Sequence, residues 1–272
     1  MALTTEARSR ITAQIDALKK RLPIDSNDLD YETHLKTIRQ LQRILDSDAV
    51  RARTEEKMKQ ETKGAIDTLI SRYPALEVCR DSVTAAAEAI VNTYKNGGKV
   101  ITCGNGGSAA DAEHIVGELM KGFLKKRPVP QEFAARLAEI SPAHAEYLTK
   151  NLQQPLAAVS LVAGVALPTA FANDQAGDLV FAQQVYGIGR TGDVLLAIST
   201  SGNSANVIYA VELAKALGIT TVALTGKSGG KLKAIADITI AVPDDETYRI
   251  QELHLPVYHA LCIAAEAEFF PQ

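Results

Sequence analysis

Four side chains that can do chemistry follow one glycine-rich segment. The segment GNGG, residues 104–107, comes after an apolar, strand-like run, and Ser108, Asp111, His114 and Glu118 come after it in a helical pattern. A strand, a glycine turn and a helix in this order direct backbone N–H groups and the positive end of a helix dipole at one point, which favours a bound phosphate. His114 and Glu118 are four residues apart, so they share one helix face. A phosphate site beside a carboxylate and an imidazole is typical of an enzyme that acts on phosphate esters.

Two further predictions concern the first residues of this helix. Ser108 is expected to offer a hydroxyl to the same anion, and Asp111 to reach back toward the turn as in a capping box. A purely structural interpretation stays open, because a glycine-rich turn is often only a tight turn and a His/Glu pair is often solvated. The segment also lacks the Lys-Ser/Thr ending of a nucleotide P-loop. The occurrence of both features within one short segment favours the site.

A second segment, DVLLAISTSGNS at 193–204, repeats this design. A buried strand leads into a turn rich in hydroxyls and then into a helix. The hydroxyls are those of Ser199, Thr200, Ser201 and Ser204. Without a basic residue they suit a phosphate monoester held by hydrogen bonds, whereas an ordinary N-cap explains only one or two of them.

Short apolar runs alternate with helical segments from residue 99 onward. This alternation predicts a doubly wound α/β layer with buried parallel strands. The expected strands lie near 99–103, 157–162, 193–199, 221–225 and 238–242, and the expected helices at 108–122, 178–189, 203–217, 229–235 and 248–269.

The N-terminal part and one insertion stand outside this alternation. Residues 4–22 and about 30–62 predict a helical hairpin, and 65–96 predict one or two helices that break near Tyr73-Pro74 and end at Asn96-Gly97-Gly98. We therefore expect a helical extension at 1–64 and an α/β domain at 65–272. The insertion at about 125–152 has a short helical pattern around Phe133–Ile140 and is either a wall or lid of the site or a surface excursion.

Composition excludes several classes of protein. The 272 residues are 46% hydrophobic, with a net charge of −3 and a pI near 6.0, which argues against general binding to nucleic acid or to a membrane surface. The widely spaced Cys79, Cys103 and Cys262 predict neither a disulfide framework nor a thiolate zinc site, and they fit a cytoplasmic protein. The longest apolar run, 156–172, is broken by polar residues and is too short for a membrane span, so it predicts a strand followed by a helix.

The last helical segment carries several polar residues, each of which can also be an ordinary packing or surface residue. Glu252 and His259 are seven residues apart and nearly aligned on an ideal helix, whereas Gln251 and His259 are about 80° apart. Geometry alone favours Glu252, although Pro256 between them bends helices.

The segments CGNGGSAADAEH, STSGNSANVI, TGKSGGK, ADI and RIQELH resemble the sugar isomerase domain family, and within it the branch that acts on sedoheptulose 7-phosphate. The resemblance runs from about residue 75 to 270, apart from the insertion. It implies a three-layer αβα sandwich with a five-stranded parallel sheet, a homotetramer, and active sites at subunit interfaces.

The resemblance also implies roles for particular residues. The residues that match the family's substrate-binding positions are Asn105, Gly106, Gly107, Ser108, Asn173, Asp174, Ser199, Thr200, Ser201, Ser204 and Gln251. The matches to its metal-binding positions are His114, Glu118, Gln251 and His259, which selects Gln251 over Glu252 and implies one zinc ion per subunit.

Such residues permit the interconversion of a ketose and an aldose. The reaction moves a proton between C1 and C2 through an enediolate, with Glu118 expected as the base and His259 as the acid. Zinc would serve as electrophile, although a carboxylate bound to zinc is a weaker base. The expected product from sedoheptulose 7-phosphate is D-glycero-D-manno-heptose 7-phosphate.

This sequence departs from the family pattern at two positions close to the expected sugar-binding site. Tyr248 replaces an Asp before Arg-Ile-Gln-Glu, and Lys121 and Gly122 stand where an Arg is common. The alternatives are therefore an isomerase of another sugar phosphate, or a non-catalytic protein of the same domain family that senses phosphosugars or acts as an adaptor for a replication initiator. The presence of a base and an acid favours the enzyme.

Overall fold

The computed structural model describes residues 5–22, 30–42 and 60–270, and the chain forms two compact units, Met1–Lys57 and Met58–Gln272. In the first unit, α1 spans Thr5–Arg21 and a second helix spans 30–42. These are the two helices predicted for the N-terminal part, of which residues 43–59 lie outside the described residues. The division predicted after residue 64 falls inside α3, Gln60–Arg72, which belongs to the second unit.

The second unit contains the predicted sheet of five parallel strands. The strands are β1 (Val100–Gly104), β2 (Ala158–Ser160), β3 (Val194–Ile198), β4 (Thr220–Thr225) and β5 (Ile238–Ala241). Their order is β2-β1-β3-β4-β5, and every pair is parallel. After β1 the chain continues to β2 on one side of it, and then crosses to β3 on the other side. The boundary between β1 and β3 is therefore the topological switch point of the sheet.

Helices and 3₁₀ turns precede, connect and follow these strands. They are η2 (Pro74–Cys79), α4 (Arg80–Lys95), α5 (Gly107–Met120), α8 (Ala166–Asp174), η3 (Gly177–Leu179), α9 (Val180–Ile188), α10 (Ala205–Ala216), α11 (Leu232–Ile235) and α12 (Thr247–Phe269). The break predicted at Pro74 is confirmed, and α4 ends at Asn96 and the left-handed Gly97 (φ +76°). In the described part of the chain, no helix is long and apolar enough to cross a membrane.

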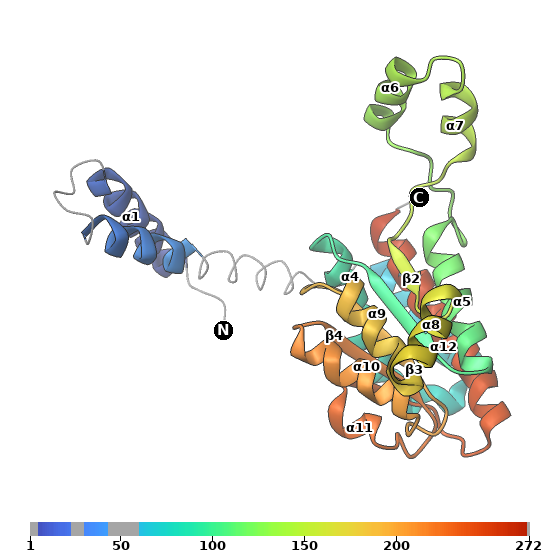
Figure 1. Cartoon of the computed structure of the whole chain (residues 1–272). Helices are drawn as coiled ribbons and strands as arrows, with labels where there is room; N and C mark the ends of the chain where they lie inside the picture. Colours follow the sequence, from blue (N-terminus) through green and yellow to red (C-terminus); the bar gives the residue numbers. More distant parts are fainter. Residues whose placement is uncertain (1–4, 23–29, 43–59, 271–272) are drawn as a thin grey trace. The chain divides into compact units, whose positions relative to one another are not determined.

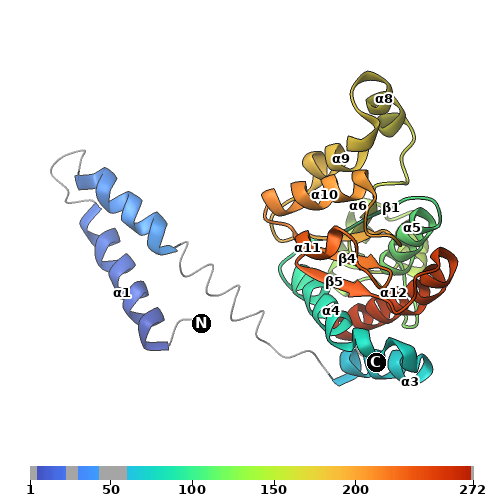
Figure 2. The same cartoon turned by 90° about the horizontal axis from the view of Figure 1, so that it is seen from below.

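Alternating side chains of the strands supply two hydrophobic cores. Along β3, Leu195 and Ala197 join the core that includes α9 and α10, while Leu196 and Ile198 join the core that includes α3, α4, α5 and α12. Figure 2 shows α4 and α12 on one side of the sheet and α9 and α10 on the other. Burial on both faces explains why the strands read as continuous apolar runs and confirms the αβα sandwich.

The insertion forms two helices, of which the sequence predicted one. These are α6 (Gln131–Ile140) and α7 (Ala145–Asn151). In Figure 1 they stand clear of the sheet as a hairpin. None of α6 is buried, and α7 buries only Ala145. Within one chain the insertion is thus a surface excursion.

A buried ion pair joins the base of this insertion to α12. Arg127 and Glu266 are 0% and 1% exposed, and Arg127 Nε donates to Glu266 Oε1 at 2.8 Å. The same carboxylate accepts hydrogen bonds from the backbone N–H groups of residues 123, 124 and 125. Arg127 Nη1 also donates to the carbonyl of Leu119 at 2.7 Å, near the end of α5. The pair therefore fixes the end of the helix that carries Glu118.

We expect Glu266→Gln to lower the free energy of unfolding by about 3–5 kcal/mol, because the substitution leaves the buried Arg127 charge uncompensated. Chemical denaturation monitored by circular dichroism measures this loss. The control is Glu77→Gln, which removes an exposed partner of Arg80 and should change stability far less. Equal stability of the wild type and Glu266→Gln would contradict the assigned role of the pair.

Candidate functional site

A cavity of about 360 Å³ lies where β1 and β3 end. The register pairs Gly104 with Ile198, so the turns that follow the two strands are neighbours. The cavity is lined by Asn105, Gly106, Gly107, Ser108, Ile198, Ser199, Thr200, Ser204, Thr247 and Gln251. We call it the cradle. None of its lining residues is basic, and α5 and α10 begin at or next to it, so it suits an anion held by hydrogen bonds and helix dipoles.

The glycines of the first turn give the cradle its shape. Gly106 adopts φ +57°, a conformation that side chains disfavour. A Cβ on residue 107 would lie 2.5 Å from Gln251 Nε2, so only glycine lets the α12 amide approach the turn this closely. The amide of Gln251 therefore forms part of the cradle, as the resemblance implied, while Glu252 is exposed.

The second turn brings three of its four hydroxyl residues into the cradle. Ser199 Oγ lies 3.0 Å from Ser204 Oγ, and Thr200 lines the cavity between them. Ser201 is not part of the lining; its Oγ accepts a hydrogen bond from the backbone N–H of Asn203. Ser201 therefore shapes the loop in this structure.

An amide pair bridges the two turns. Asn105 and Asn206 donate to each other through their side chains, each at 2.9 Å. Neither Asn206 nor Thr247 was predicted from the sequence. A single Asn in the first turn of a helix has no pattern of its own, and only the pairing of β1 with β3 places it opposite Asn105.

A second cluster lies on α5 and α12. His114 Nε2 lies 3.2 Å from Glu118 Oε1, and the rings of His114 and His259 are 5.1 Å apart. His114 Nδ1 is 3.0 Å from the hydroxyl of Tyr258, which donates to Asp111 Oδ1 at 3.2 Å. The capping role predicted for Asp111 is wrong: the N-cap, Gly106, has no side-chain hydrogen bond, and Asp111 faces α12.

Burial changes the acid–base properties of this cluster. It lowers the pKa of His259, so the neutral imidazole is favoured, and it raises the pKa of Asp111. Burial, reinforced by the nearby Asp111, also raises the pKa of Tyr258. The Nε2 atom of His259 is buried and has no hydrogen-bond partner.

The arrangement of His114 and Glu118 fits a cation. Tyr258 has one proton and gives it to Asp111, so its oxygen accepts from His114 Nδ1. In neutral His114, Nε2 is then an acceptor that faces another acceptor, Glu118 Oε1. With the unpartnered His259 Nε2, these are ligand types that zinc takes. Within the described ranges, however, no three His, Cys, Asp or Glu side chains already stand arranged around a metal position.

One predicted pair lies elsewhere in the chain. Asn173 and Asp174 end α8, where Asn173 donates to Asp174 at 2.9 Å, and both are exposed. Neither lines the cradle.

Comparisons with known proteins identify the domain family. The SIS domain matches residues 66–153 and 143–226. The phosphoheptose isomerase of Shewanella baltica is 40% identical over 209 residues, which cover 76% of this chain and 93% of that protein.

Solved structures of two phosphoheptose isomerases are also similar. The structure from Neisseria gonorrhoeae is 36% identical with a TM-score of 0.58, covering 74% of this chain and 94% of that one. The structure from Francisella tularensis is 33% identical with a TM-score of 0.57, covering 74% and 93%. The chain belongs to the SIS domain family, and its identity to phosphoheptose isomerases over three quarters of its length marks it as an isomerase of that family.

Proposed function

We propose that this protein is an aldose–ketose isomerase that converts sedoheptulose 7-phosphate to D-glycero-D-manno-heptose 7-phosphate. The observation that carries the proposal is the pairing of a neutral, hydroxyl-lined cradle with the Glu118 and His259 cluster. The name of its relatives, phosphoheptose isomerase, supports the choice of a heptose phosphate. The free, buried thiols of Cys79, Cys103 and Cys262 are compatible with work in a reducing cytoplasm.

The cradle binds the phosphate, and the α5–α12 cluster acts on the opposite end of the sugar. Glu118 removes the proton from C1 of the ketose, which leaves an enediolate, and the same carboxyl returns a proton to C2. His259 serves the oxygens: its neutral imidazole takes the proton from O1 and, once protonated, gives it to O2. The side chain of Glu118 is only 13% exposed, so the transferred proton is partly protected from solvent.

A zinc ion, if bound, would be held by His114, Glu118, Gln251 and His259, and it would supply positive charge for the developing oxyanion. Gln251 is a weak neutral ligand, so moderate affinity is expected. Because Glu118 is both ligand and base in this proposal, its carboxylate would have to leave the ion or share it loosely while it takes the C1 proton.

We further propose a homotetramer with the active sites at subunit interfaces. Asn173 and Asp174 lie outside the cradle of their own chain, on a helix without buried residues. The neighbouring Val165 and Leu167 are 76% and 51% exposed. An interface through α8 would cover these apolar side chains and bring the Asn-Asp pair toward the sugar of another subunit.

Gly107→Ala should weaken the binding of inorganic phosphate about tenfold, because its Cβ displaces the Gln251 amide and costs about one hydrogen bond. Titration calorimetry measures the affinity. Gly117→Ala is the control, since a Cβ at residue 117 of the same helix meets open space. Unchanged affinity in Gly107→Ala would remove Gln251 from the phosphate site.

Glu118→Gln should reduce turnover of sedoheptulose 7-phosphate at least about 100-fold, because the amide cannot accept the C1 proton. Binding of inorganic phosphate should persist. Glu113→Gln, an exposed change on the same helix, should leave turnover intact. Full activity of Glu118→Gln would contradict the mechanism, and a wild type that binds the phosphosugar without converting it would support a sensing protein or another substrate.

A further inference from the structure

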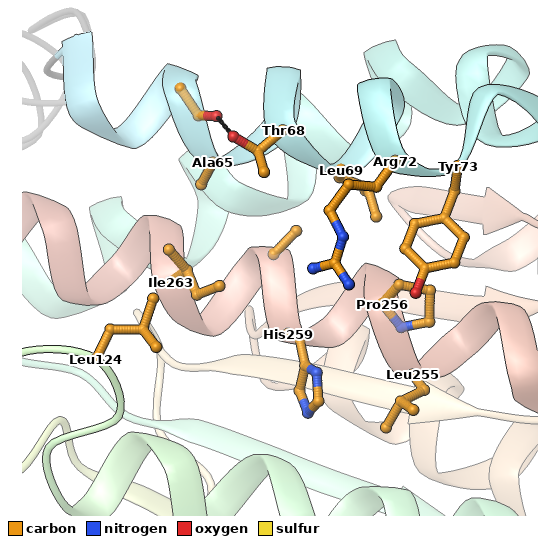
Figure 3. A pocket seen from close by; sticks show the side chains of 12 residues that line it. Ala65, Thr68, Leu69, Arg72, Tyr73, Leu124, Leu255, Pro256, His259 and Ile263 are labelled. Carbon is orange, nitrogen blue, oxygen red and sulfur yellow. Dashed lines mark hydrogen bonds between the residues drawn. The ribbon is translucent and has the colours of Figure 1, made fainter.

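A second cavity, of about 290 Å³, lies between α3 and α12. One side is lined by α3, with Leu69 and Arg72 among its residues, and by Tyr73; the other side is lined by α12, with Leu255, Pro256 and His259 among its residues. Figure 3 shows that the Arg72 side chain extends from α3 toward the turn of α12 that carries His259. Most of the lining side chains are apolar, and Arg72 is the only Lys or Arg among them.

Arg72 has no carboxylate partner among the residues that the structure describes. Its guanidinium lies 5.5 Å from the centre of the Tyr73 ring, which orients it without neutralising it. The other cation beside the acid–base cluster, Lys121, is already bound to Glu118 at 3.0 Å. Arg72 is thus a positive charge beside this cluster that is available to a ligand.

The α3–α12 cavity and the cradle share no lining residue, but α12 contributes side chains to both. Gln251 lines the cradle and His259 lines the second cavity, with Leu255 midway between them. Eight residues at 1.5 Å per residue separate the two ends by about 12 Å along α12. An extended, acyclic sugar phosphate has the shape to place its phosphate at the first end and its carbonyl at the second.

We propose that the α3–α12 cavity is the subsite for the carbonyl end of the substrate and that Arg72 is a substrate-binding residue in it. This inference rests on the proposed function. The planar guanidinium presents several N–H donors, a geometry that matches two neighbouring oxygens. In an enediolate, O1 and O2 are such a pair, and they gain negative charge as the proton leaves carbon.

The test compares Arg72→Gln with Lys63→Gln, a cation on the exposed side of the same helix that does not line the cavity. Titration calorimetry gives the affinities of each variant for inorganic phosphate, which probes the cradle alone, and for sedoheptulose 7-phosphate, which probes both ends. Turnover is measured on the same samples, and Arg72→Lys tests whether charge without the planar donors suffices.

We expect Arg72→Gln to keep the wild-type affinity for inorganic phosphate, to lose most of the additional affinity for the sugar phosphate, and to lower kcat/KM tenfold or more. Arg72→Lys should recover part of the loss, and Lys63→Gln should match the wild type. The inference is overturned if Arg72→Gln equals the wild type, or if the wild type binds the sugar phosphate no better than inorganic phosphate. Preferential binding that needs Arg72 but leads to no turnover would overturn the proposed isomerase and keep the subsite.

Discussion

The parallel pairing of β1 with β3 is the constraint on which the site depends. It sets Gly104 opposite Ile198, so a glycine-rich turn and a hydroxyl-rich turn, almost a hundred residues apart in sequence, end at the same edge of the sheet. Two helices start there, and their dipoles add to the attraction for an anion. The amide pair of Asn105 and Asn206 ties the turns together across the gap. A phosphate can therefore be held without a lysine or arginine, which leaves positive charge to be used elsewhere.

The long helix α12 converts this anion site into a candidate catalytic site. It carries Gln251 to the cradle and His259 to the cluster around Glu118, and it is itself held by the buried pair of Glu266 and Arg127. The same pair caps the end of α5, so both helices that carry acid–base groups are fixed by one buried network. Arg72 approaches from a third helix, α3. The proposed chemistry thus uses side chains from three helices that pack on one face of the sheet.

Much of the fold was predictable because its signals are local. Strands buried on both faces are continuous apolar runs, and Pro74 and Gly97 mark breaks through their own backbone chemistry. Ser108, Ser199 and Ser204 were predictable for the same reason, since each lies within the stretch from the end of a buried strand to the first turn of the helix that follows it. The roles of Arg127 and Asn206 were not predictable, because each depends on a partner that is far away in the sequence. Arg127 follows Lys125 and Lys126 and has no local signal of burial, yet it is fully buried against a carboxylate 139 residues later.

NMR of the zinc-supplied protein with sedoheptulose 7-phosphate in deuterated water tests the central claim most directly. A phosphate cradle and an acid–base pair that act on one sugar predict the appearance of aldoheptose 7-phosphate signals, with solvent deuterium entering at C2 because the proton passes through a carboxyl group. An unchanged ketose spectrum, at a concentration where the protein binds the phosphosugar, would contradict the account.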